Sequence, residues 1–203
     1  MFSFLKKSRV SPKPLPDLPA DAAASDSPRM RKVLNVGGNS KEIQIPEAFG
    51  GWQHVMLDID PAVRPDVVCD ARNLATLKGS EYDAVYCSHN LEHYFHHDVS
   101  RVLAGFLHVL KDDGFAYIRV PDMAELMRAV VRDGRDIEDV LYQSPAGPIA
   151  VIDVIYGLRT EIASSGKDFL SHKTGFTGKS LAAAGRLASL KFVVSRTRNL
   201  EVA

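Results

Sequence analysis

Histidines are concentrated in one short stretch of the sequence and could supply base or metal-ligand chemistry. His89, His93, His96 and His97 fall within nine residues, and His172 stands alone farther along the chain. Imidazole titrates nearest to neutral pH of all side chains, so it can take a proton from a substrate, and its neutral nitrogens also bind metals. Because no cysteines or carboxylates repeat at ligand spacing around these histidines, the sequence predicts no metal site.

A second set of polar residues stands where apolar stretches end. The stretch 32–36 stops at Gly37-Gly38-Asn39-Ser40, and the stretch 54–57 stops at Asp58. Paired glycines allow positive φ and a close approach of a ligand to the backbone, and Asn39 can offer a short polar contact there. An acid about 20 residues after such a turn is typical of the group that binds ribose hydroxyls in doubly wound folds. The two stretches together predict a cofactor loop.

The elements that must position these residues alternate along the chain. Apolar stretches at 32–36, 54–60, 65–70, 83–88 and 115–120 predict strands, with helices or turns between them. Helices are predicted from Asp98 to Leu110, from Asp122 to about Arg132 and over 177–187. A turn is predicted over 111–114. Two closing strands are predicted over 190–195 and 199–202. Pro46 and Gly50-Gly51 limit any helix after Ser40 to one or two turns. This alternation favours a mostly parallel sheet with helices on both faces.

The composition favours one folded domain that follows a leader. Residues 1–29 are rich in Pro, Ala, Ser and Asp and predict a flexible segment, whereas residues 30–203 form the predicted domain. The 203 residues are 45% hydrophobic and 25% charged, which is ordinary for a globular protein. The less regular stretch 136–173 predicts a lid beside the binding face.

Charge and cysteine content restrict the partners and the compartment. Twenty-five basic residues balance 25 acidic ones, so no overall positive field favours nucleic acid or an anionic membrane. Cys69 and Cys87 predict small buried side chains in a reducing compartment. No stretch reaches the roughly 18 apolar residues of a membrane-spanning helix. We therefore expect a cytoplasmic protein without stable membrane insertion, acting on a small molecule; the oligomeric state stays open.

Five stretches in order carry a resemblance to a known family. From Lys32 to about Ser195 the chain resembles class I S-adenosylmethionine (SAM) dependent methyltransferases, and it looks most similar to small bacterial methyltransferase-domain proteins with a Leu-Glu-His motif. The matching stretches are 33–38, 56–60, 68–72, 82–88 with Leu91-Glu92-His93, and 109–114. Five blocks in sequence are more specific than any single one.

The resemblance implies a Rossmann-like, seven-stranded sheet with one antiparallel strand near its edge, and SAM across the carboxyl ends of the early strands. It places Gly37 and Gly38 under the methionine part of SAM and Asp58 at the ribose hydroxyls. Asp70 and the Ala71 backbone would meet the adenine amino group, and Ser88 and His89 would lie near the reactive methyl. Asn35 replaces the acid that is usual in the first motif, so it can accept a hydrogen bond but adds no charge toward the cofactor.

The function that this resemblance implies is transfer of a methyl group from SAM to a small-molecule or sugar-derived acceptor by in-line displacement. A hydroxyl or protonated amine acceptor needs a base, for which His89 and His172 are the predicted candidates. The alternative is a non-catalytic interaction or sensing module with weak or no SAM binding. A nicotinamide-dependent enzyme is disfavoured, because no GxGxxG opens a long helix after the first stretch.

Overall fold

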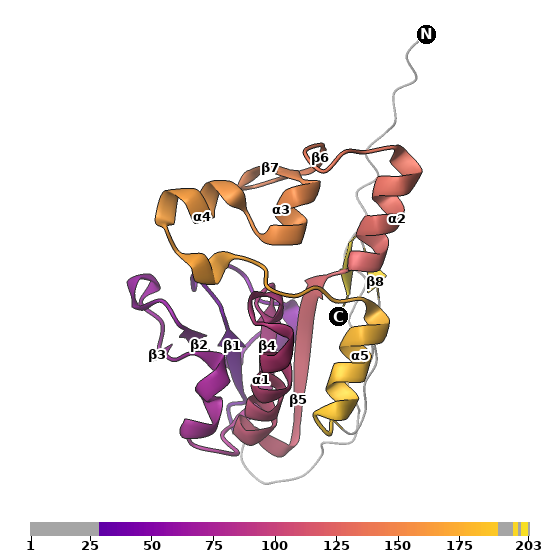
Figure 1. Cartoon of the computed structure of the whole chain (residues 1–203). Coiled ribbons are helices and arrows are strands. Elements are labelled where there is room, and N and C mark those ends of the chain that lie inside the picture. Colours follow the sequence, from indigo (N-terminus) through magenta and orange to yellow (C-terminus); the bar gives the residue numbers. More distant parts are fainter. Residues whose placement is uncertain (1–28, 191–196, 199, 203) are drawn as a thin grey trace.

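A computed structural model describes residues 29–190, 197–198 and 200–202 of the chain. All but the last residue of the predicted leader 1–29, and all but Leu190 of the predicted strand 190–195, lie outside these described residues. The strands of the central sheet have the order β3-β2-β1-β4-β5-β9-β8, of which Figure 1 labels all but β9. The strands are β1 (Lys32–Val36), β2 (Gln53–Asp58), β3 (Val67–Val68), β4 (Tyr82–Ser88), β5 (Leu110–Pro121), β8 (Thr197–Arg198) and β9 (Glu201–Val202).

The five early strands run parallel, as the alternating pattern predicts. β1 pairs in parallel with β2 and with β4, so that Val36 lies opposite both Leu57 and Cys87. β9 pairs antiparallel with β5 and with β8, and it occupies the chain end where a closing strand is predicted over 199–202. The mostly parallel α/β fold is therefore confirmed, and its carboxyl edge collects the residues that follow β1, β2, β3 and β4.

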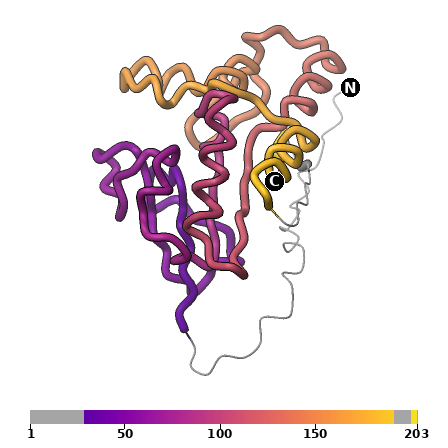
Figure 2. Tube along the Cα trace, turned by 60° about the horizontal axis from the view of Figure 1, so that its bottom comes forward, coloured from indigo at the N-terminus to yellow at the C-terminus, as the bar shows by residue number. Residues whose placement is uncertain are grey.

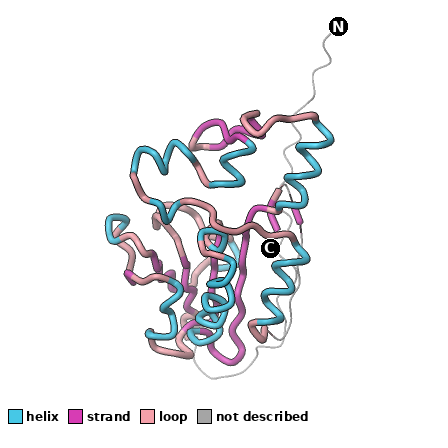
Figure 3. The backbone as a smooth tube through the Cα atoms, in the orientation of Figure 1, coloured by secondary structure: helices cyan, strands magenta, loops and turns pink. Residues whose placement is uncertain are grey.

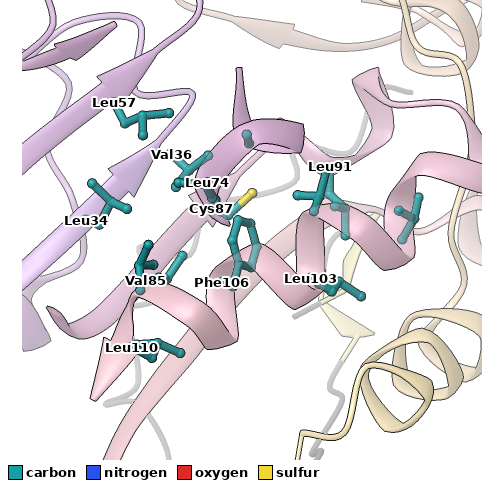
Figure 4. Close-up of a cluster of buried hydrophobic side chains, with 14 of the residues drawn as sticks. Leu34, Val36, Leu57, Leu74, Val85, Cys87, Leu91, Leu103, Phe106 and Leu110 are labelled. Atoms are coloured by element: carbon teal, nitrogen blue, oxygen red, sulfur yellow. The ribbon is translucent and has the colours of Figure 1, made fainter. Parts of the chain in front are cut away.

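One face of the sheet is covered by helices that bury the larger core. Helix α1 (His96–Val109), helix α5 (Gly178–Leu187) and the 3-10 helix η3 (Ala71–Thr76) contribute to one apolar cluster with β1 and β4, and Figure 3 shows α1 and α5 on the same side. Leu34, Val85 and Phe106 meet in this cluster (Figure 4). Cys87 is buried there as a free thiol, and Cys69 is half-buried.

Phe106→Ala is expected to lower the free energy of unfolding by roughly 3–5 kcal/mol, because it leaves a cavity in this cluster. The ring is 1% exposed. Leu187→Ala, at a side chain that is 85% exposed, is the matched control and is expected to change stability by less than about 0.5 kcal/mol. Urea unfolding measures both, and equal losses for the two variants would contradict this packing.

The other face carries an aromatic cluster beneath a short 3-10 helix. Pro46 and Gly50 flank η1 (Glu47–Phe49), which confirms that the segment after Ser40 forms no long helix. The ring of Phe49 lies 5.4 Å from Trp52 and 6.1 Å from Phe115 between centroids. Among the described residues, this 3-10 turn stands where an α-helix is expected on the second face, because proline and paired glycines interrupt helical hydrogen bonding.

Several helices and strands begin or end at residues other than those predicted from the sequence. Helix α1 begins at His96 rather than Asp98, which lies in its first turn, where a carboxylate favours the helix dipole. The predicted turn 111–114 belongs to β5, where the register with β4 shifts between Tyr82 and Ala84. Helix α2 (Met123–Asp133) begins after Asp122, whose side chain accepts a hydrogen bond from the Ala124 amide, and the side chain of Thr177 likewise caps α5.

Residues 136–173 form a separate layer across the carboxyl end of the sheet (Figures 1 and 2). This inserted segment contains the hairpin β6 (Val140–Ser144) and β7 (Gly147–Ala150), helices α3 (Val151–Tyr156) and α4 (Arg159–Ser165), and the 3-10 helix η5 (Asp168–Leu170). Asp153 joins its parts, because its carboxylate accepts hydrogen bonds from the Ala150 amide and from Arg159 Nε, both at 2.9 Å. Within the described ranges, no helix combines the length and apolar content that crossing a bilayer demands.

Candidate active site

A cavity of about 620 Å³ lies between the carboxyl edge of the sheet and the inserted segment. Its volume falls in the range of sites for small molecules and cofactors, roughly 300–1,000 Å³. The loops after β1, β2, β3 and β4 contribute Gly37, Asp58, Asp70 and His89 to its wall, and the inserted segment contributes Lys167 and His172. The cavity therefore joins residues that are more than 100 positions apart in the sequence.

The turn after β1 needs glycine at both positions. Gly37 has φ +71°, and a Cβ atom there would lie 2.2 Å from Asn90 Nδ2. A Cβ atom on Gly38 would lie 2.6 Å from Asn35 Nδ2. Because real Cβ atoms do not approach other heavy atoms so closely, the paired glycines let Asn35 and Asn90 pack against the turn.

Gly37→Ala is expected to cost more stability than Gly134→Ala. Both residues have positive φ, +71° and +59°, so alanine pays left-handed strain of about 1–2 kcal/mol at either position. Gly134 has no neighbouring atom within 4 Å of the added Cβ, whereas Gly37 meets Asn90. Overpacking adds roughly 1–3 kcal/mol at Gly37. Urea unfolding measures the difference, and equal costs would show that Asn90 does not pack on this turn.

Asp58 ends β2 and fixes the turn after β1. Its carboxylate is 8% exposed and accepts hydrogen bonds from the backbone amides of Asn39 at 3.0 Å and Asp60 at 2.9 Å. Each carboxylate oxygen has two lone pairs, so each can still accept a hydrogen bond from a ligand in the cavity. Next to Asp58, Ile59 is 38% exposed and lines the same wall.

The carboxylate of Asp70 is fixed by Arg72, two residues later in the chain. This carboxylate accepts a hydrogen bond from the Arg72 amide at 2.9 Å and pairs with Arg72 Nη2 at 2.6 Å. Burial opposes the charge, but the hydrogen bonds and positive charge of Arg72 outweigh it and lower the pKa of Asp70. The charged Asp70–Arg72 pair thus forms one side of the cavity wall.

His89 follows β4 and bridges two carboxylates. Its backbone is left-handed, with φ +50°, and its Nε2 lies 2.9 Å from Glu201 Oε1 on β9. Its Nδ1 lies 3.5 Å from Glu92 Oε1. Burial disfavours the imidazolium, but Glu201 and Glu92 outweigh it and raise the pKa of His89 to about 9. Arg119 also pairs with Glu201, so His89 belongs to a charged network that includes the last strand.

His172 presents one nitrogen without a hydrogen-bond partner in the described structure. Its Nδ1 lies 2.9 Å from the carbonyl oxygen of Val154. A carbonyl only accepts, so Nδ1 carries the hydrogen and Nε2 carries the lone pair. Burial lowers the pKa of His172, an effect that the charge of Glu92 partly offsets. His96 and His97 are exposed and do not line the cavity.

Comparison with known proteins shows what the fold resembles. Residues 31–118 match the family model described as methyltransferase domain. Over this stretch, which is less than half of the chain, the protein is similar to a methyltransferase domain. It superimposes on a SAM-dependent methyltransferase from Archaeoglobus fulgidus with TM-score 0.50 and 18% identity, over 83% of this chain and 63% of that one.

Two further structures share the fold of this chain. A Pyrococcus horikoshii protein gives TM-score 0.53 at 17% identity, over 86% of this chain and 81% of that one. An O-methyltransferase family protein from Burkholderia thailandensis gives TM-score 0.54 at 15% identity, over 86% and 49%. The chain thus spans less than two thirds of the Archaeoglobus and Burkholderia proteins. A search of the curated proteins finds no match.

The fold brings six predicted site residues to one cavity: Gly37, Asn39, Asp58, Asp70, His89 and His172. The other four, Asn35, Gly38, Ala71 and Ser88, do not line it. Asn35 is buried behind the turn, so it supports Gly38 instead of facing a ligand.

Ile59 and Asn90 also line the cavity and were not among the predicted site residues. Asn90 has a buried Oδ1 without a hydrogen-bond partner. Its position before Leu91-Glu92-His93, at the end of a predicted strand, was the available signal. Ile59 gave a weaker signal as an apolar residue between two acids.

Proposed function

We propose that the protein is a SAM-dependent methyltransferase that acts on a small-molecule or sugar-derived acceptor. The observation that carries this proposal is the meeting of Gly37, Asp58, Asp70 and His172 on one cavity wall of suitable volume. A non-catalytic module would need no such convergence of a glycine turn, strand-end acids and a histidine with a free lone pair.

The wall offers groups that suit each part of SAM. Asp58 would accept hydrogen bonds from the ribose hydroxyls, and exposed Ile59 would pack against the adenine. Gly37 and Asn39, on the turn after β1, would lie against the methionine part. Bound SAM supplies a methyl group on a positively charged sulfur.

The remaining wall would bind and align the acceptor. Methyl transfer needs a nucleophile held in line with the methyl group and shielded from water, which the inserted segment over the cavity can provide. We place His172 at the acceptor, because its Nδ1 is fixed by Val154 and its Nε2 has a lone pair to receive the acceptor proton. We propose that His89 supports the structure of the cavity wall and is not the base, because both of its ring nitrogens face carboxylates.

Transfer of radioactive methyl from SAM to a panel of small acceptors tests the proposed function. The panel contains phenols, hydroxy acids, nucleotide sugars and amines, and the proposal expects labelled product from at least one class. Binding of SAM without transfer to any member would favour the non-catalytic module. NADH titration checks the nicotinamide alternative and is expected to show no saturable binding.

A further inference from the structure

Glu92, His93 and His172 form a group of potential metal ligands beside the cavity. One carboxylate oxygen of Glu92 and one ring nitrogen of each histidine all lie within 4.8 Å of one another. Glu92 and His93 belong to the 3-10 helix η4 (Leu91–His93), and His172 follows η5 in the inserted segment. We propose that these three side chains bind a divalent transition-metal ion of the zinc type.

Glu92 is the first reason for this assignment. Its side chain is 1% exposed, and neither carboxylate oxygen receives a hydrogen bond. The nearest charged partner is His89, whose Nδ1 is 3.5 Å from Oε1. His89 also pairs with Glu201, whose Oε1 lies 2.9 Å from its Nε2, so one imidazolium is shared between two carboxylates. A buried carboxylate without hydrogen-bond donors is destabilising unless positive charge or a proton compensates it. A divalent ion on Glu92 would complete the compensation that His89 supplies in part.

His172 is held as metal-binding histidines usually are. It donates from Nδ1 to the Val154 carbonyl oxygen, which fixes the ring and leaves Nε2 as the ligand atom. His93 has Nδ1 3.2 Å from the Ser171 carbonyl oxygen and Nε2 3.2 Å from that of His89. A neutral imidazole has a single N–H, so only one of these contacts is a hydrogen bond. The other nitrogen has a lone pair that faces a carbonyl oxygen, and the His93 ring would have to turn to bring this nitrogen to an ion.

The donor set selects the class of ion. Two imidazole nitrogens and one carboxylate oxygen suit zinc and its neighbours in the first transition row, whereas magnesium and calcium prefer oxygen alone. Ligand atoms of tetrahedral zinc lie about 3.4 Å apart, so pairs of ligand atoms here, all within 4.8 Å, would need to close by at most about 1.4 Å. His93 and His172 also line the cavity, so a further coordination position would face it.

The consequence for catalysis rests on the proposed function. A hydroxyl group of the acceptor, bound at the open position, would lose its proton more readily beside the ion. Because His172 Nε2 would then bind the ion, the proton would pass to water in the cavity. The predicted acceptor is a hydroxyl compound.

Zinc binding to the untagged full-length chain tests the site directly. After incubation with zinc chloride and desalting, elemental analysis is expected to give about one zinc ion per chain, with micromolar or tighter affinity by competition with a chromophoric chelator. Cobalt(II) in place of zinc should give visible absorption bands of a four- or five-coordinate site. Magnesium should not compete. Substoichiometric zinc, or cobalt spectra of the hydrated ion alone, would overturn the site.

Variants identify the ligands independently of catalysis. His172→Ala and Glu92→Gln are each expected to weaken zinc binding by about tenfold or more, whereas His96→Ala and Glu81→Gln, outside the group, should bind as the unchanged protein does. Unaltered affinity in His172→Ala would refute the assignment even if Glu92→Gln fails to fold. SAM titration of the same samples separates the two proposals, because zinc binding without SAM binding refutes only the proposed function, and the reverse result refutes only the metal site.

Discussion

Asp58→Ala is expected to weaken SAM binding by roughly 30- to 100-fold, the equivalent of about 2–3 kcal/mol. The variant removes the carboxylate that would accept the ribose hydroxyls, and hydrogen bonds to charged groups are stronger than those between neutral groups. It also removes the acceptor that the Asn39 amide uses, so the turn after β1 loses support. Isothermal titration of the variant with SAM measures the change in affinity.

Asp66→Ala is the matched control for Asp58→Ala. The carboxylate of Asp66 also accepts a hydrogen bond from a backbone amide, that of Met56 at 2.8 Å, but Asp66 does not line the cavity. Its removal should change stability and leave the SAM affinity within about threefold of the original, less than 0.7 kcal/mol. Equal losses of affinity in the two variants would mean that Asp58 acts only through folding.

His172→Ala is expected to lower the rate of methyl transfer by roughly 100-fold or more, while SAM affinity changes little. The side chain lies on the acceptor side of the cavity, and its Nε2 carries the lone pair that either receives a proton or binds the proposed ion. Single-turnover transfer to an acceptor found in the panel separates this loss from changes in acceptor binding.

His96→Ala is the control for the histidine substitution, because His96 is exposed at the start of α1 and does not line the cavity. Its transfer rate should match that of the original protein. If His172→Ala also retained the full rate, the acceptor would have to bind elsewhere on the cavity wall, and the proposed role of His172 would be wrong.

The sequence predicted the sheet well because local signals and the fold agree. Apolar stretches ending in glycine or acid correspond to β1, β2 and β3, and the stretch ending at Ser88 corresponds to β4; the carboxyl ends of these strands meet because parallel strands share one edge. The short helix after Ser40 was predictable for the same reason, since proline and glycine act locally. Boundaries such as the start of α1 were less predictable, because Phe95 gives no side-chain cap there.

The histidine chemistry was only partly predictable. Spacing along the chain could not reveal that His172 reaches the group of Glu92 and His93, because the inserted segment carries it there from 79 positions away. Nor could it reveal that Glu201, near the chain end, pairs with His89. Both contacts are tertiary, and no periodicity or motif in one sequence encodes them.

Titration of the untagged full-length chain with SAM and with S-adenosylhomocysteine decides whether the cavity binds the cofactor. We expect one saturable site with a dissociation constant of about 100 µM or tighter for at least one of the two compounds, and weaker binding in Asp58→Ala. An absence of binding by both compounds at millimolar concentration would contradict this expectation.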